Sequence, residues 1–118
     1  MSPLYTGFPG IIYAGLWILK KVGILKREVP NAKILVLVTD APPAFMATIE
    51  NGDFQIEILE QVLTPQDLDS VASDMHIAIP SNYFLGSVEG ILDGISKNII
   101  KIKDQNILIM LGKIASVF

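Results

Sequence analysis

The feature that most constrains the fold is the dipeptide Asn51-Gly52, which stands between two runs rich in apolar residues. A type I′ turn needs positive φ at both central positions, and Asn-Gly is the pair that adopts this conformation most easily. Residues 45–50 and 54–59 are therefore predicted to pair as a β-hairpin. In the second run apolar and polar residues alternate, so one face of that strand is expected to be buried.

A further strand is predicted directly before this hairpin. Residues 34–39 are ILVLVT, an apolar pattern typical of a central strand that is covered on both faces. The segment Asp40 to Pro43 ends this strand, because consecutive prolines cannot donate hydrogen bonds to a sheet. The three strands are therefore expected to form a meander.

The remaining segments predict helices that alternate with two more strands. Thr64 and Pro65 begin a short helix, with threonine as N-cap and proline at the first helical position. The other elements are expected at 11–25 (helix), 74–79 (strand), 83–95 (helix), 99–103 (strand) and 106–118 (helix). Hairpins mixed with helical crossovers indicate an α+β layer structure. The chain is expected to be one domain, 1–118, with its N-terminal helix at about 11–25 and a sheet-and-helix core at about 33–118.

Composition excludes several classes of function. The 118 residues include no cysteine, which removes disulfides, zinc–thiolate sites and thiol nucleophiles. The net charge is −3 and no basic run is present, which argues against a nucleic-acid partner. The most apolar stretch, 8–25, is interrupted by Lys20 and Lys21, so its uncharged part falls short of the roughly 20 residues that cross a bilayer. We therefore expect a cytoplasmic protein.

Few residues are candidates for catalysis. His76 is the only histidine, and it alternates with Asp74 on a predicted strand, so the pair can share a face as a general base. No nucleophile stands beside them, and one histidine with scattered carboxylates makes a poor metal site. Glycine-rich phosphate-binding motifs are also missing from the sequence. We expect His76 to be structural or on the surface, with no catalytic residue, no metal and no cofactor.

Gly86, Gly90 and Gly94 recur every four residues in the helix predicted at 83–95. Glycine in a helix interior costs about 1 kcal/mol relative to alanine, so three of them need a reason. Close packing of this helix face against another backbone is one explanation. A slot for a ligand, left by the missing side chains, is the other.

The predicted closing helix carries more apolar residues than one core-facing stripe needs. Its stripe consists of Ile107, Leu108, Leu111, Ile114, Ala115 and Phe118. Ile109, Met110 and Val117 add apolar surface outside that stripe, and the first helix shows a similar excess around Trp17 and Ile18. Such a helix is buried on several sides, pairs with another chain or lines an apolar cavity.

The segment from residue 74 to the end follows a recognisable order of elements. An aspartate opens an alternating strand, and a polar turn, a helix with an early phenylalanine and a later glycine, a lysine-bearing strand and a closing helix come after it. The residues that carry this pattern are Asp74, Ile77, Pro80, Ser81, Phe84, Gly90, Lys97, Ile100 and Ile102. In these features the segment resembles the sterol carrier protein type two family. By element order the resemblance extends over about 30–118.

This resemblance implies a five-stranded mixed sheet covered mainly on one side by helices. It also implies a hydrophobic tunnel that binds fatty-acyl chains, sterols or similar lipids without catalysis. The lining residues it suggests are Phe84, Val88, Ile91, Leu111, Ile114 and Phe118. Membrane and partner-domain binding are known in the family, so peripheral membrane contact and a homodimer remain as further expectations. The alternative is an interaction module without a ligand, docking through Ile109, Met110 and Val117.

Overall fold

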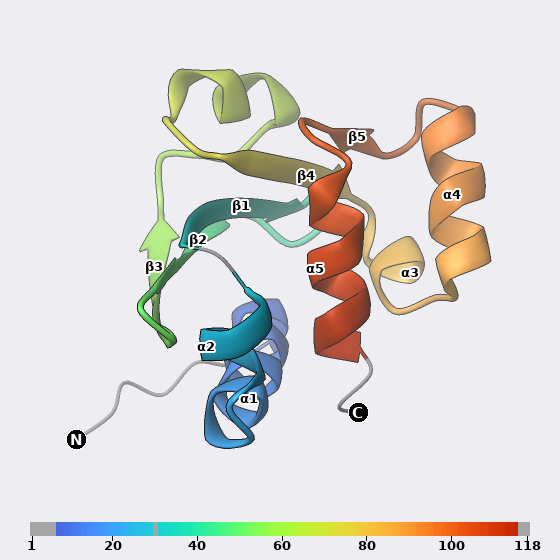
Figure 1. Ribbon diagram of the computed structural model, residues 1–118. Helices are drawn as coiled ribbons and strands as arrows, with labels where there is room; N and C mark the ends of the chain where they lie inside the picture. Colours follow the sequence, from blue (N-terminus) through green and yellow to red (C-terminus); the bar gives the residue numbers. More distant parts are fainter. Residues whose placement is uncertain (1–6, 30, 116–118) are drawn as a thin grey trace.

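The computed structural model describes residues 7–29 and 31–115 and shows a five-stranded mixed sheet in the order β3-β2-β1-β4-β5 (Figure 1). The strands are β1 (Ala32–Val38), β2 (Ala44–Glu50), β3 (Asp53–Leu59), β4 (Met75–Ile79) and β5 (Lys101–Ile102). The helices are α1 (Gly7–Lys21), α2 (Ile24–Glu28), the 3-10 helix η1 (Pro65–Ser70), α3 (Ser81–Phe84), α4 (Val88–Ser96) and α5 (Asn106–Ala115). β1 and β4 are parallel, and the other neighbours are antiparallel. The predicted α+β class is confirmed.

The hairpin predicted around Asn51-Gly52 is present. Asn51 has φ 53° and Gly52 has φ 79°, the two positive values that a type I′ turn requires. The strands pair in register over their whole length, from Glu50 opposite Asp53 at the turn to Ala44 opposite Leu59. Local turn chemistry therefore determines how this edge of the sheet pairs.

Two predicted helices are each divided in two. The helix expected at 11–25 begins earlier, at Gly7, and α1 ends at Lys21, where the chain turns at Gly23 with φ 82° before α2. The helix expected at 83–95 is split into α3 and α4 by residues 85–87. Ser87 caps α4, because its hydroxyl oxygen accepts a hydrogen bond from the Gly90 N–H at 3.1 Å. The spacing of apolar residues correctly predicted both helical regions, but neither interruption was predicted from the sequence.

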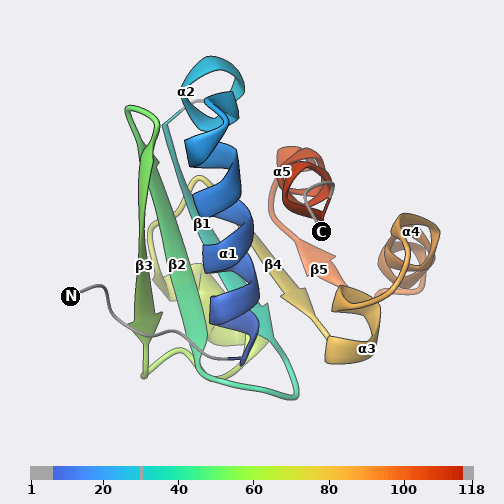
Figure 2. The same ribbon diagram turned by 90° about the horizontal axis from the view of Figure 1, so that it is seen from below.

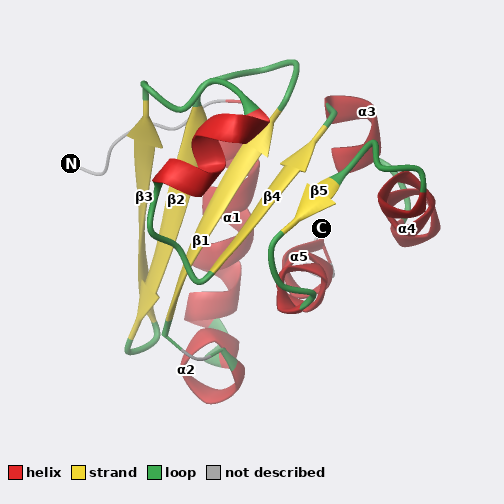
Figure 3. Cartoon of the chain, turned by 90° about the horizontal axis from the view of Figure 1, so that it is seen from above, coloured by secondary structure: helices red, strands yellow, loops and turns green. Residues whose placement is uncertain are grey.

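The sheet has a core on each face, and β1 contributes to both. Ile34 and Val36 belong to the larger core, and Leu35 and Leu37 to the smaller one. α1 and α5 lie on the side of the larger core (Figure 2), which we call the helical face. η1 lies on the opposite side, near β1 and β2 (Figure 3), which we call the η1 face. Helices therefore cover mainly one side of the sheet.

η1 begins as the sequence predicted. Thr64 is its N-cap, Pro65 is its first residue, and Thr64 and Asp67 form a reciprocal capping box. Hydrogen bonds from the backbone N–H groups of Leu63 and Thr64 hold the pKa of the Asp67 carboxyl below its usual value. This cap holds η1 in place, and its Leu68 is buried in the smaller core.

Candidate ligand site on the helical face

The position of α3 depends on a contact between segments 41 residues apart. Asp40, in the turn after β1, accepts hydrogen bonds from the backbone N–H of Ser81 at 2.8 Å and from its hydroxyl. These bonds lower the pKa of the Asp40 carboxyl. A charge-assisted pair of this kind fixes where α3 begins and so where its last residue, Phe84, lies.

Several half-buried apolar side chains of the described residues pack against the core of the helical face, and we call six of them, from α1, α3, α4 and α5, the apolar rim. The apolar rim consists of Phe8, Phe84, Ile91, Ile95, Leu108 and Leu111. They come from α1, α3, α4 and α5; Figure 2 shows α1 over the middle of the sheet, α5 over β4, and α3 and α4 near the β5 edge. Phe8 and Phe84 meet edge to face, with ring centroids 5.2 Å apart and an interplanar angle of 83°. This contact joins α1 to α3 across 76 positions of sequence.

Three of the six predicted lining residues lie in the apolar rim. Phe84, Ile91 and Leu111 are half-buried and pack against one core, as lining residues of a shared site must. The side chains of Val88 and Ile114, and the whole of Phe118, lie outside the described part of the structure. Among the residues that sequence reasoning missed, Phe8 is the clearest. Its place in the most apolar stretch was visible, but its partner in α3 was not.

The three regularly spaced glycines do not act as one stripe. Gly86 lies between α3 and α4 rather than in a helix. A Cβ at Gly94 would lie 2.6 Å from Ile100 Cδ1 and 3.0 Å from Tyr83 Cε1, so close packing explains this glycine. A Cβ at Gly90 would meet only the Ser87 hydroxyl, at 3.4 Å. α4 is therefore tightly packed at its C-terminal half and less so near its start.

A separate groove of about 220 Å³ lies between α2 and α5 at one end of the sheet. Its lining is Glu28, Val29, Ala32, Met75, Asn106, Ile109, Met110 and Lys113. The floor is apolar, and an ion pair stands at the rim, with Glu28 Oε1 and Lys113 Nζ 3.6 Å apart. The groove can accept a small apolar group.

The prediction of an exposed apolar face on the closing helix is wrong for one residue, Met110. Met110 is only 6% exposed and belongs to the core of the helical face, so it is not surplus surface. Ile109 is 60% exposed, as that hypothesis required. Val117 lies outside the described residues. The neighbouring positions differ because α5 packs on the sheet with its Ile107–Met110 side.

His76 and Asp74 do not form the pair that a general base would use. The Asp74 carboxylate accepts a hydrogen bond from the backbone N–H of Lys33 at 2.7 Å. His76 is buried, and within the described chain its Nδ1 has no hydrogen-bond partner. Burial lowers the pKa of His76, Asp69 opposes this effect and Lys103 adds to it. Burial within β4 therefore favours the neutral imidazole.

Two features are absent from residues 7–29 and 31–115. No group of three His, Asp or Glu side chains in this part of the chain is placed to hold a metal ion. None of the helices described is both long and apolar enough to span a bilayer. Searches against protein-family models, curated proteins and solved structures found no match to the chain.

Proposed function

We propose that this protein binds an apolar ligand, such as a fatty-acyl chain or a sterol-like lipid, on the helical face and performs no catalysis. The observation that supports this most directly is the apolar rim. Four helices contribute half-buried aromatic and aliphatic side chains that pack against one core, and three of these side chains are the ones expected to line a lipid site. We propose the cytoplasm as the site of action and no cofactor.

The physical mechanism needs only burial of hydrocarbon. Each methylene that moves from water into an apolar site contributes about 0.8 kcal/mol. Affinity therefore increases with chain length, while a pocket lined by hydrocarbon discriminates weakly between ligands of similar shape. The twelve- and eight-carbon fatty acids differ by four methylenes, so their binding free energies should differ by roughly 3 kcal/mol.

α4 offers a matched pair of residues for testing the site. Ile91 is half-buried and packs against the core of the helical face, whereas its neighbour Leu92 is 51% exposed. Substitution by glutamine at the two positions places the same side chain at neighbouring residues of one helix, one half-buried and one exposed. Only the change at Ile91 places a polar amide at the proposed site.

The experiment is a titration of the delipidated protein with a fluorescent fatty acid, followed by displacement with unlabelled acids of increasing length. The wild-type protein is expected to bind saturably, and longer acids are expected to displace the probe at lower concentration. Ile91→Gln and Leu111→Gln should each weaken binding about tenfold, equivalent to roughly 1.4 kcal/mol. Leu92→Gln should leave the affinity unchanged.

Absence of saturable binding removes the proposal. Equal loss in the Ile91 and Leu92 variants also contradicts it, because the effect would then not come from the helical face. Circular dichroism of each variant shows whether the fold is retained, so a failure to fold is not mistaken for a loss of binding.

A homodimer remains the second candidate function, and the exposure of Ile109 beside the groove supports it. An isoleucine that is 60% exposed at the edge of an apolar groove is the kind of residue that an interface covers. Light scattering is the measurement, with Ile109→Lys as the variant. A dimer that becomes monomeric favours this candidate, and a wild-type monomer excludes it.

A further inference from the structure

Two asparagines of the described chain share a left-handed backbone conformation, but different residues follow them. Asn51 has φ 53° and Asn98 has φ 60°, and both residues are exposed. Asn51 precedes Gly52 and is the only one of the five asparagines in the chain that precedes a glycine. Asn98 precedes the β-branched Ile99. The two asparagines are therefore a matched pair in which only the next residue differs.

The backbone nitrogen after each asparagine is in a different state. The Ile99 N–H donates a hydrogen bond to the Gly94 carbonyl oxygen at 2.9 Å. The Gly52 N–H donates to no acceptor in residues 7–29 and 31–115, and the Asn51 side-chain amide is equally unbonded there. A nitrogen that is held in a hydrogen bond must give up that bond before it can react. The Gly52 nitrogen has no such bond to lose, and no side chain blocks the approach to it.

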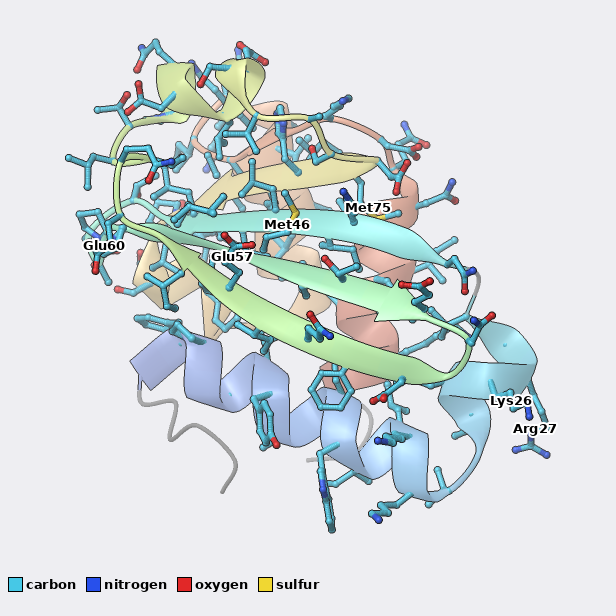
Figure 4. The ribbon with its side chains drawn as sticks, turned by 90° about the vertical axis from the view of Figure 1, so that its left-hand side faces the viewer. Lys26, Arg27, Met46, Glu57, Glu60 and Met75 are labelled. Carbon is cyan, nitrogen blue, oxygen red and sulfur yellow. The ribbon has the colours of Figure 1, made fainter. Side chains whose placement is uncertain are left out.

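The turn that holds Asn51 and Gly52 packs closely against its surroundings. Asn31 Oδ1 accepts a hydrogen bond from the Asn51 backbone N–H at 2.9 Å. A Cβ at Gly52 would lie 2.7 Å from Lys26 Cβ and 3.2 Å from Lys26 Cα, so the turn touches the backbone of α2. Figure 4 shows this turn beside α2, from which Lys26 extends. A longer backbone in the turn therefore has no room on the side of α2.

We propose that Asn51 is a site of spontaneous deamidation, and that the isoaspartate formed there loosens the hairpin from α2. The Gly52 nitrogen attacks Cγ of Asn51. The new N–Cγ bond forms, the Cγ–Nδ2 bond breaks, and ammonia leaves with the proton of the Gly52 N–H. Water then opens the resulting succinimide at one of its two carbonyl carbons. Opening at Cγ gives aspartate at position 51, and opening at the backbone carbonyl carbon gives isoaspartate.

The two products affect the turn differently. Aspartate leaves the main chain as it was, and Asp-Gly forms the same type I′ turn as Asn-Gly. Isoaspartate leads the main chain through Cβ and Cγ, which inserts a methylene group between the two turn residues. The inserted group disturbs the tight turn at the point where Gly52 contacts Lys26. Isoaspartate should therefore weaken the packing of the hairpin on α2, whereas aspartate should not.

The first experiment measures deamidation in the intact, folded protein at neutral and mildly alkaline pH. Peptide mapping by mass spectrometry gives the rate at each asparagine, and carboxyl methylation by an isoaspartyl methyltransferase detects the isoaspartate. We expect Asn51 to deamidate at least about tenfold faster than Asn98, which corresponds to roughly 1.4 kcal/mol in activation free energy. The rate at Asn51 should increase with pH, because the attacking nitrogen must lose its proton.

Two variants separate the chemistry of the side chain from that of the backbone. Asn51→Gly removes the reacting amide and keeps the turn, since Gly-Gly also forms type I′ turns. It should abolish the isoaspartate at this position and leave the rate at Asn98 unchanged. Asn51→Asp carries the charge of the deamidated protein on an unaltered backbone, so its thermal midpoint should stay close to that of the wild type. The isoaspartyl form, isolated by chromatography from aged protein, should unfold at least about 4 °C lower than Asn51→Asp.

Three results would overturn the proposal. Asn51 that reacts in urea but not in the folded protein would show that the native turn prevents the attack. Equal rates at Asn51 and Asn98 would show that the next residue and its hydrogen bond do not matter. An isoaspartyl form as stable as Asn51→Asp would show that the turn accommodates the longer backbone. The tests need no ligand, so their outcome is independent of the proposed function.

Discussion

The two faces of the sheet show different ways of covering apolar strands. The η1 face has a small core in which every member is nearly inaccessible, formed by Leu35, Leu37, Ala44, Met46, Val62, Leu68 and Ala78. Among the described residues, only Leu59 and Val71 pack against it from partly exposed positions. The helical face has a larger core, and eleven partly buried apolar side chains within 7–29 and 31–115 pack against it.

This difference is the basis of the proposed location of the ligand site. A short helix such as η1 covers a small core closely and leaves little accessible hydrocarbon. Separate helices such as α1, α4 and α5 leave apolar side chains partly exposed where they meet, so the helical face retains hydrocarbon that a ligand can cover. The η1 face is expected to supply stability alone, and the helical face both stability and binding.

The largest effect on stability is expected from a cavity in the core of the η1 face. Leu68→Ala removes a side chain that is 1% exposed, and we expect the free energy of unfolding to fall by about 3 kcal/mol. Leu63→Ala, at a residue 50% exposed just before η1, should change it by less than about 1 kcal/mol. Urea denaturation measures both. A Leu68 variant that also loses fatty-acid affinity while still folded would break the separation between the faces.

The next effect distinguishes the two halves of α4. Gly94→Ala should lower the free energy of unfolding by roughly 1–3 kcal/mol, because its methyl group would collide with Ile100 and Tyr83. Gly90→Ala should raise it by about 0.5–1 kcal/mol, because a helix gains an alanine and the space is free. Thermal unfolding of the two variants should shift the midpoint in opposite directions. Shifts of the same sign would contradict the packing described for α4.

A smaller effect is expected on the pH dependence of stability, and it comes from a residue on the η1 face. Burial holds the pKa of His76 below 6.5, so the unfolded chain takes up this proton first as the pH falls. Stability is therefore complete above about pH 6.5 and decreases below it, by at most about 1.4 kcal/mol per pH unit. His76→Gln should flatten that dependence, because the chain has no other histidine. An unchanged slope in this variant would show that His76 is not the titrating group.

The smallest effect on stability is expected at the exposed anchor of α3. Ser81 lowers the pKa of Asp40, so the contact is present at neutral pH and is lost as the pH falls below the usual carboxyl value near 3.8. Asp40→Asn should slightly lower the thermal midpoint at pH 7 and lower it less at pH 3. The Phe84 ring signals in NMR spectra should also broaden at pH 7. A midpoint that drops equally at both pH values would contradict this role of the charge.

Local patterns were sufficient to predict the strands. Asn51-Gly52 determines a turn on its own. The apolar run 34–39 predicts a strand that is buried on both faces, and this prediction does not require knowing which elements pack against it. The element order, the hairpin and the capping of η1 follow from such short-range rules. These rules depend on the chemistry of neighbouring residues and need no tertiary information.

The missed features depend on contacts between distant segments. Gly23 ends α1 through a left-handed conformation that helical periodicity alone does not reveal. Met110 was counted as surplus apolar surface, but the way α5 rests on the sheet buries it. The Phe8–Phe84 contact joins two helices whose relation depends on the whole topology. Sequence reasoning suggested Phe84, Ile91 and Leu111, and it could not supply Phe8.

The most direct measurement of the central claim is a methyl-resolved NMR titration of the delipidated protein with a saturated fatty acid. Ile91 and Leu111 report on the helical face, and Leu35 and Leu68 report on the η1 face. We predict saturable shifts of the Ile91 and Leu111 methyl signals, with those of Leu35 and Leu68 nearly unchanged. Unchanged signals on both faces, or shifts confined to the η1 face, would contradict the claim that the helical face holds the ligand site.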